Sequence, residues 1–327
     1  MARTSDIYCD HFGLSERPFS LVPDPTFLFW GRSHRRAFTV LEYGLMTRAP
    51  ITLLTGEVGA GKTTLLQHLL TRIEDDVTVG LVSNAQGDQG ELLRWVLHAF
   101  EQPAPPERTY VDLFAQFQDF LLDEYAAGRR VILIFDEAQH LGRSALEELR
   151  MYTNINSVKD EILQLILVGQ PELRDVVARP DLTQFAQRVA VGFHLPALSA
   201  EDVADYIAHR MAVAGGADDT FETGATLLIH DRTGGVPRLV NQLCDFALLY
   251  AFTDGSDRVT EGIVRQVLDD DVFFGGRAKR DPLRLIDPVV PEGAPKGAAP
   301  EGAHGGAVPE GMHGKVVTET GKGARDA

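Results

Sequence analysis

The sequence is poor in cysteine and contains no long apolar run. Its two cysteines, Cys9 and Cys244, lie far apart and lack the spacing of metal ligands. Disulfides and structural zinc sites are therefore not expected, which is typical of a reducing compartment. Apolar runs such as "VILIF" and "LILV" are far too short to cross a bilayer, and the N-terminus has no apolar segment of a secretory signal. We expect a soluble cytoplasmic protein without a transmembrane segment, with peripheral attachment at the inner membrane as the alternative.

Positive charge is also scarce. The chain has 31 Lys and Arg residues against 47 Asp and Glu residues, which gives a formal net charge of −16. This balance disfavours nonspecific binding of nucleic acid along the whole chain. Two short basic clusters, at 31–36 and 128–130, could still form a local patch that binds nucleic acid. The alternative interpretation is that they are solvated faces of loops. The length of 327 residues suffices for one large core or two linked ones.

The pattern of apolar segments predicts an α/β fold followed by helices. Up to residue 198, short β-rich runs alternate with helical patterns, which is typical of a parallel sheet with helices on both faces. The runs are nearly continuous in apolar residues, as expected for strands buried on both sides. The predicted strands are 51–56, 77–84, 131–137, 163–170 and 191–196.

The rest of the chain divides into a helical region and a tail. Residues 199–274 show helical periodicity, with Ser199 as the predicted N-cap of the first helix. They predict a small helical lid domain after the α/β domain of residues 1–198. Residues 275–327 are rich in Pro, Gly and Ala and carry an imperfect nine-residue repeat that starts with "PEG" at positions 291, 300 and 309. This composition predicts a disordered tail, either a tether or a segment that binds a partner.

A glycine-rich loop follows the first predicted strand. Residues 56–63, "GEVGAGKT", fit the phosphate-loop (P-loop) pattern G-x-x-x-x-G-K-[ST] and stand between a strand and a helix. Backbone N–H groups and the helix dipole favour phosphate there. Lys62 is expected to contact the β- and γ-phosphates, and Thr63 to coordinate Mg²⁺. The predicted nucleotide-binding residues are Gly56, Glu57, Val58, Gly59, Ala60, Gly61, Lys62, Thr63 and Thr64.

Two adjacent carboxylates end the third predicted strand, "VILIFDE". In open α/β sheets ligands bind at the carboxyl ends of the strands. Asp136 is therefore predicted to hold Mg²⁺, and Glu137 to act as the general base or to orient the attacking water. Gln170 ends the next strand and is predicted to sense the γ-phosphate. Asn84 ends the second strand, where it either restrains Glu137 or serves in a turn.

The motifs together resemble the AAA+ ATPases, and more narrowly the ATPase domain of general secretion pathway protein A (ExeA-type). The resemblance rests on "FGLSERPFSLVPDPTFLFWGRSHRRA", "LTGEVGAGKTTLL", "FDEAQHL", "LILVGQPEL" and "GGVPRLVNQLCDFAL", in this order. It implies a catalytic set of Lys62, Asp136, Glu137, Gln170, Arg188 and Arg238. In that set Arg238 is the lid arginine that reaches the γ-phosphate, and Arg188 is an arginine finger that serves a neighbouring subunit of a homo-oligomeric ring or filament.

The same resemblance implies an ATPase that uses ATP with Mg²⁺, since nothing in the sequence is typical of guanine recognition. It suggests a motor or switch for a cell-envelope secretion or export assembly, whose protein partner the sequence does not name. The alternative is a DNA-binding ATPase of the transposition-helper type, which the acidic balance disfavours. The founding secretion protein continues into a transmembrane helix and a peptidoglycan-binding region, whereas this chain continues into its tail. The aromatic N-terminal segment either packs the first helix or, near His34, walls the adenine base.

Overall fold

The computed structural model describes residues 7–74, 76–83, 91–155 and 161–274, all within one compact unit that spans residues 1–280. The predicted tail with its "PEG" repeats and Asn84 both lie outside the described residues. Within the described part, no helix is long and apolar enough to cross a membrane.

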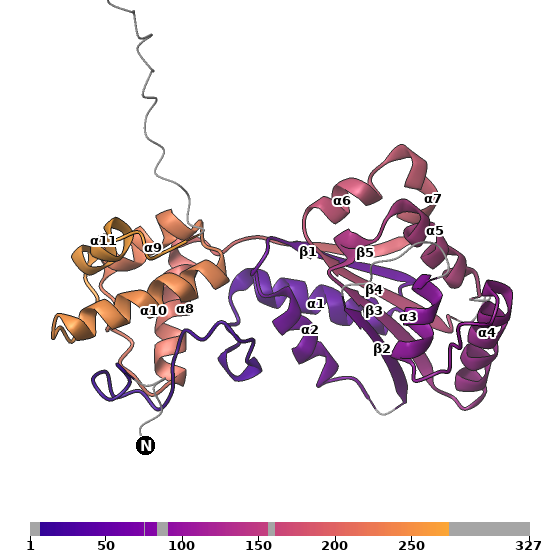
Figure 1. The fold of residues 1–327 in the computed structure, drawn as a ribbon, viewed down its shortest axis with the longest axis horizontal. Helices are drawn as coiled ribbons and strands as arrows, with labels where there is room; N and C mark the ends of the chain where they lie inside the picture. Colours follow the sequence, from indigo (N-terminus) through magenta and orange to yellow (C-terminus); the bar gives the residue numbers. More distant parts are fainter. Residues whose placement is uncertain (1–6, 75, 84–90, 156–160, 275–327) are drawn as a thin grey trace, which may run out of the picture. The chain divides into compact units, whose positions relative to one another are not determined.

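A parallel sheet of five strands organises the first part of the molecule (Figure 1). The strands run in the order β2-β3-β4-β1-β5, and each neighbouring pair in this order is parallel. All five predicted strands are confirmed, with ends that differ by two residues at most. Their bounds are β1 Ile51–Gly56, β2 Val77–Ser83, β3 Arg130–Asp136, β4 Leu163–Gly169 and β5 Val189–Leu195.

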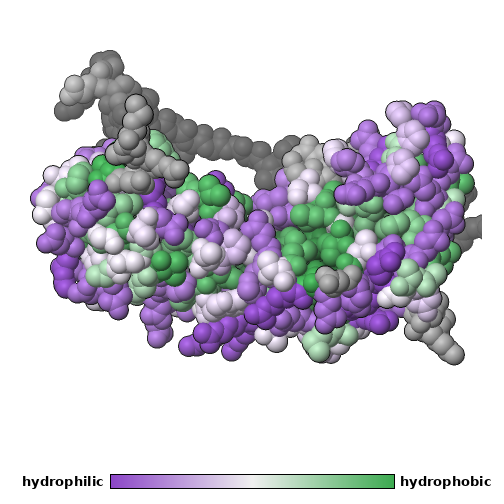
Figure 2. Space-filling model, turned by 90° about the horizontal axis from the view of Figure 1, so that it is seen from below, coloured by the Kyte–Doolittle hydropathy of each residue, from purple (hydrophilic) through white to green (hydrophobic). Residues whose placement is uncertain are grey.

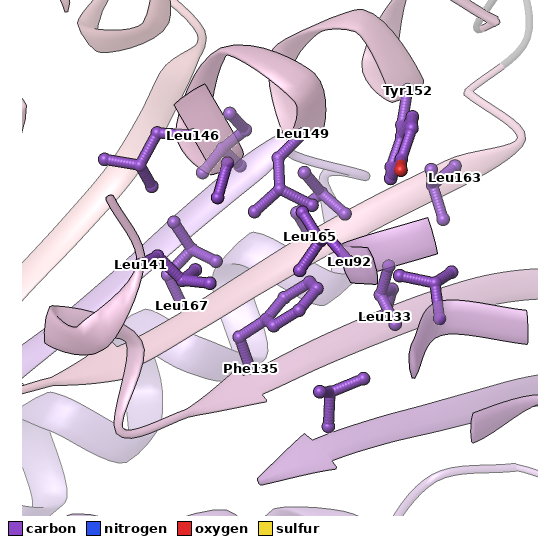
Figure 3. Close-up of a cluster of buried hydrophobic side chains, with 14 of the residues drawn as sticks. Leu92, Leu133, Phe135, Leu141, Leu146, Leu149, Tyr152, Leu163, Leu165 and Leu167 are labelled. Atoms are coloured by element: carbon purple, nitrogen blue, oxygen red, sulfur yellow. The ribbon is translucent and has the colours of Figure 1, made fainter. Parts of the chain in front are cut away.

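Alternate residues of the strands point to opposite faces, and each face has its own core. On one face Phe135 of β3 and Leu165 of β4 pack against leucines of the covering helices, together with the buried ring of Tyr152 (Figure 3). The helices that supply this core are α3 (Glu91–Ala99), α4 (Tyr110–Ala126), α5 (Arg143–Tyr152), α6 (Glu172–Val177) and α7 (Thr183–Ala186).

On the other face Ile134 and Ile166 pack against two helices, α1 (Arg32–Met46) and α2 (Lys62–Leu70). These helices present Phe38 and Leu65, which are almost completely buried. Because both faces of the sheet are covered, the strands must be apolar throughout, which explains why the sequence pattern identified them.

A third core lies among four further helices, α8 (Ala200–Val213), α9 (Thr223–Thr233), α10 (Pro237–Thr253) and α11 (Glu261–Asp269). The side chain of Ser199 accepts a hydrogen bond from the Asp202 N–H and caps α8, as predicted.

The N-terminal segment contributes to this helical core and not only to the first helix. Tyr8, Phe19 and Phe27 are buried in it, and the Ser15 N–H donates to the Ala214 carbonyl at 2.8 Å. The predicted first domain, residues 1–198, therefore includes a segment that packs with the helices assigned to the second. The sequence could not reveal this because the two halves of the contact are about two hundred residues apart.

Short 3₁₀ turns join several elements. They are η1 (Pro25–Phe27), η2 (Ala138–His140), η3 (Thr153–Ile155) and η4 (Pro180–Leu182). The turn η2 follows β3 directly, and it is important for the site because it places Gln139 beside the end of β4.

Candidate active site

The glycine-rich loop connects β1 to α2 and is shaped by two glycines in the left-handed region. Gly59 has φ +77° and Gly61 has φ +95°, backbone conformations that residues with a Cβ rarely adopt. Helix α2 begins at Lys62, with Gly61 as its N-cap. Its first N–H groups have no partner within the helix, so the loop presents donors and a positive dipole end at one place. This is the arrangement that an anion needs.

Lys62 is buried and folds back over the loop. Its Nζ donates to the Gly56 carbonyl at 2.8 Å and to the Glu57 carbonyl at 2.9 Å. Burial lowers the pKa of the Lys62 ammonium, against the nearby charges of Glu137, Asp136 and Glu57. The Lys62 ammonium is therefore held by two loop carbonyls, with carboxylates nearby.

Thr63 and Asp136 meet at the edge of the sheet. The Thr63 hydroxyl donates to Asp136 Oδ2 at 3.1 Å, although 73 residues separate the two in sequence. The backbone N–H of Glu137 donates to the other oxygen of Asp136 at 2.9 Å. Burial raises the pKa of the Asp136 carboxyl, and these two hydrogen bonds oppose that rise. The hydroxyl and carboxylate predicted to hold Mg²⁺ are thus brought together.

Glu137 is held by two glutamines. Gln139 Nε2 donates to Glu137 Oε2 at 2.6 Å, and Gln170 Nε2 donates to the same oxygen at 3.3 Å. The Gln170 N–H in turn donates to Gln139 Oε1 at 3.0 Å. Burial raises the pKa of the Glu137 carboxyl, but the two amide donors and the charge of Lys62 outweigh it and keep that pKa below its ordinary value. Glu137 also has φ +56°, a conformation that costs a non-glycine residue energy.

Gln170 therefore lies beside Glu137, where the strand order β3-β4-β1 predicts it. Gln139 was not predicted as part of the site. It follows Glu137 by two residues within η2, and the sequence carries no signal of its role, because the role depends on the turn that this short helix makes.

The start of α10 contacts the loop directly. The Arg238 N–H donates to the Gly59 carbonyl at 3.2 Å. A Cβ at position 59 would lie 2.4 Å from the Arg238 Cβ, which no real structure tolerates. The predicted lid arginine thus stands at the phosphate loop, with its side chain exposed at the mouth of the cavity described next.

A cavity extends from the loop between the N-terminal segment and helices α8 and α10. In its wall the Tyr206 hydroxyl donates a hydrogen bond to Asn241 Oδ1 at 2.7 Å. Asn241 Nδ2 in turn donates to the Ser20 carbonyl at 3.3 Å. Sequence reasoning missed most of this wall, because its members come from distant segments without a shared motif. Besides Glu137 and residues of the loop and the start of α2 (58–64), the lining residues are Ser20, Leu21, Val22, Pro23, Asp24, Phe27, Leu28, Phe29, His34, Tyr206, Arg210, Pro237, Arg238 and Asn241.

Arg188 is not part of this cavity. It precedes β5, whose Val189 pairs with Ile51 at the amino end of β1, whereas Gly56 ends β1 at the opposite edge. Strand β1 has six residues, so the two edges lie roughly 16 Å apart. The Arg188 guanidinium bonds instead to Asn154 Oδ1 at 2.7 Å.

The donor set near the loop fits Mg²⁺ bound together with phosphates. Among the residues that the structure describes, no group of three or more His, Cys, Asp or Glu side chains could hold a metal alone. Mg²⁺ is usually bound by one or two protein oxygens, several waters and the phosphates of a substrate. Thr63 and Asp136 supply that share of the ligands.

Known proteins share sequence and fold with this chain. A family model described as an AAA domain matches residues 46–177. General secretion pathway protein A of Aeromonas hydrophila is 39% identical over 256 residues, which is 78% of this chain and 47% of that protein. Across these residues the chain belongs to the AAA+ ATPases of the general secretion pathway protein A type. It spans about half the length of this curated relative.

Solved structures support the AAA+ fold. Cdc6p from Pyrobaculum aerophilum matches with a TM-score of 0.60 at 16% identity, and the Aeropyrum pernix ORC2 protein, solved in complexes with ADPNP and ADP, matches with 0.58 at 19%. Each match covers 78% of this chain and 72% of the other. The predicted fold class, an AAA+ parallel sheet followed by helices, is confirmed.

The contact between the loop and α10 generates a prediction on stability. Gly59→Ala adds a strained φ and a clash with Arg238, so we expect a loss of about 2–4 kcal/mol in the free energy of unfolding. The matched control is Gly128→Ala, because Gly128 has φ +78° and nothing within 4 Å of an added Cβ. It should lose only about 1–2 kcal/mol. Equal losses in urea denaturation would show that α10 does not constrain the loop.

Proposed function

We propose that the chain binds ATP with Mg²⁺ at the glycine-rich loop, hydrolyses it, and acts as a motor or switch for a cell-envelope secretion or export assembly. The contact of Thr63 with Asp136, at the N-terminus of α2 and beside Lys62, is the observation that carries the proposal. It joins the N-terminus of α2, where an anion is favoured, to a carboxylate at the end of β3.

Binding follows from the donors around the loop. The N–H groups at the start of α2 donate hydrogen bonds to the phosphate oxygens, and Lys62 exchanges its carbonyl partners for phosphate oxygens. Arg238, at the mouth of the cavity, contacts the terminal phosphate with its planar fork. Mg²⁺, when bound, neutralises charge that develops on the phosphates, and Thr63 and Asp136 are the side chains that hold it.

Hydrolysis requires a group that prepares water. Glu137 serves as this group, because its carboxylate lines the cavity and its low pKa keeps it ionised at neutral pH. Both glutamine amides bond to Oε2, so Oε1 is the oxygen that orients the water and takes its proton.

The proposed cellular role rests on the name of the Aeromonas relative and on charge. The net charge of −16 disfavours the DNA-binding alternative. In the basic cluster at 128–130, Arg129 is already paired with Glu124 at 2.6 Å, which reduces the positive potential available to a nucleic acid.

A homo-oligomer, ring or filament, is part of the proposal. Arg188 lies at the sheet edge opposite its own loop, so it reaches a nucleotide only if that nucleotide is bound by another copy. Figure 2 shows hydrophobic residues gathered on one face over the α/β region. Helix α1 also exposes two large apolar side chains, Tyr43 and Met46. Exposed apolar patches are typical of interfaces.

The first test is nucleotide binding. ATP with Mg²⁺, at 100 times its dissociation constant, should stabilise the fold by about 2.7 kcal/mol. Lys62→Ala should abolish this shift, because it removes the cation that the β- and γ-phosphates need. Thermal melts measure the effect, and better protection by GTP than by ATP would overturn the nucleotide assignment.

The second test separates hydrolysis from binding. Glu137→Gln keeps the shape and removes the charge, so ATP should bind normally while turnover falls by roughly 10²- to 10⁴-fold. Glu201→Gln, an exposed carboxylate on α8, is the matched control and should retain wild-type turnover. Phosphate release measures the rate, and normal hydrolysis by Glu137→Gln would contradict the mechanism.

The third test is assembly. Arginine fingers contribute about 10³- to 10⁵-fold in turnover, so specific activity should rise with protein concentration. Arg188→Ala should bind ATP and hydrolyse it poorly, and mixing it with Lys62→Ala should restore some activity at mixed interfaces. Arg265→Ala, which removes an exposed arginine of α11, is the control. If specific activity does not change with protein concentration and the mixture regains no activity, Arg188 is an ordinary surface residue and not an arginine finger.

A further inference from the structure

His34 contacts the phosphate loop although it belongs to another element. It lies in the first turn of α1, lines the cavity, and exposes only 5% of its surface to solvent. Its Nε2 is 3.1 Å from the carbonyl oxygen of Ala60, in the centre of the loop.

The contact determines the tautomer of the ring. A carbonyl oxygen only accepts hydrogen bonds, so Nε2 must carry the hydrogen and donate it. The other nitrogen, Nδ1, is buried, and none of the residues that the structure describes forms a hydrogen bond with it. Burial also lowers the pKa of His34, so the ring is neutral near pH 7. The imidazole therefore acts on the loop as a fixed, uncharged donor.

The direction of the Ala60 carbonyl sets the direction of the next N–H. A trans peptide is planar, and its C=O and N–H point to opposite sides. Because the Ala60 carbonyl points at His34, the Gly61 N–H points away from His34. Gly61 is the N-cap of α2, and its N–H belongs to the set that a phosphate binds.

We propose that His34 is a positioning residue of the nucleotide site, which holds the Ala60–Gly61 peptide so that the Gly61 N–H faces the phosphates. The inference rests on the proposed function for its ligand. The loop cannot set this peptide by itself, because glycine at φ +95° is free to adopt other conformations. The histidine restrains it, and the fit is close: a Cβ at position 61 would lie 3.1 Å from His34 Nε2.

The test compares variants with and without the donor. His34→Leu removes it, whereas His34→Gln restores an N–H donor at the position of Nε2. His98→Leu, an exposed histidine on α3, is the matched control. The ligands are ATP and tripolyphosphate, both with Mg²⁺, in calorimetric titrations. His34→Leu should weaken both ligands by about tenfold, the loss expected for one buried hydrogen bond. His34→Gln should recover to within about threefold of wild type.

Tripolyphosphate distinguishes this role from contact with the base. If His34→Leu weakens ATP alone, the histidine reads the adenosine, and the proposal is overturned. If both ligands bind to His34→Leu as to wild type, His34 only packs α1, which overturns it equally. A general loss of fold would lower the melting temperature without ligand, and His34→Phe, which keeps a planar ring without the donor, then replaces His34→Leu.

A measurement on the wild-type chain needs no bound nucleotide. Long-range ¹H–¹⁵N spectra of labelled histidine should show His34 neutral, with the hydrogen on Nε2. A hydrogen on Nδ1 would overturn the proposal, because Nε2 could not then donate to Ala60. If wild type binds neither ATP nor tripolyphosphate, the proposed function fails and the positioning role fails with it. If wild type binds both but the tautomer is wrong, only the His34 inference fails.

Discussion

Parallel pairing of β3, β4 and β1 is the constraint on which the site depends. In the register, Leu167 of β4 lies level with Leu53 of β1 and with Phe135 of β3. Parallel strands end at one edge, so the glycine-rich loop, the carboxylates and Gln170 all emerge there within a few residues of that level. The buried leucines and Phe135 that fix this register (Figure 3) therefore also fix the distance from Thr63 to Asp136.

The edge gathers charged groups that cost energy to bury. Lys62 is almost fully buried, and Asp136 and Glu137 are half-buried beside it. Lys62 uses loop carbonyls as partners, Asp136 uses a hydroxyl and an N–H, and Glu137 uses two amides. These partners orient the groups before any ligand arrives, which lowers the reorganisation that binding and catalysis demand. Glu137 makes its hydrogen bonds from a left-handed backbone conformation, which costs energy.

The sequence predicted those parts of the structure that local patterns encode. Strands buried on both faces leave continuous apolar runs, and the loop and the Asp136–Glu137 pair follow two of them, so the placement of Lys62, Thr63 and Asp136 was predictable. The partners of Glu137 were only half predictable, because Gln170 ends a strand whereas Gln139 depends on a short turn. The cavity wall was not predictable. Ser20 is 221 residues from Asn241 in the sequence, and no periodic pattern connects it with Tyr206 or Asn241.

The packing of the N-terminal segment with α8–α11 has a consequence for synthesis on the ribosome. Tyr8 bonds to Asp245, 237 residues later in the chain. At about 5–20 residues per second, roughly 10–50 seconds pass between the synthesis of these two residues. During that time Phe19 and Phe27 lack the helices that cover them in the finished protein. The α/β sheet can form before the helical core closes, so the cavity wall is among the last parts of the molecule to be completed.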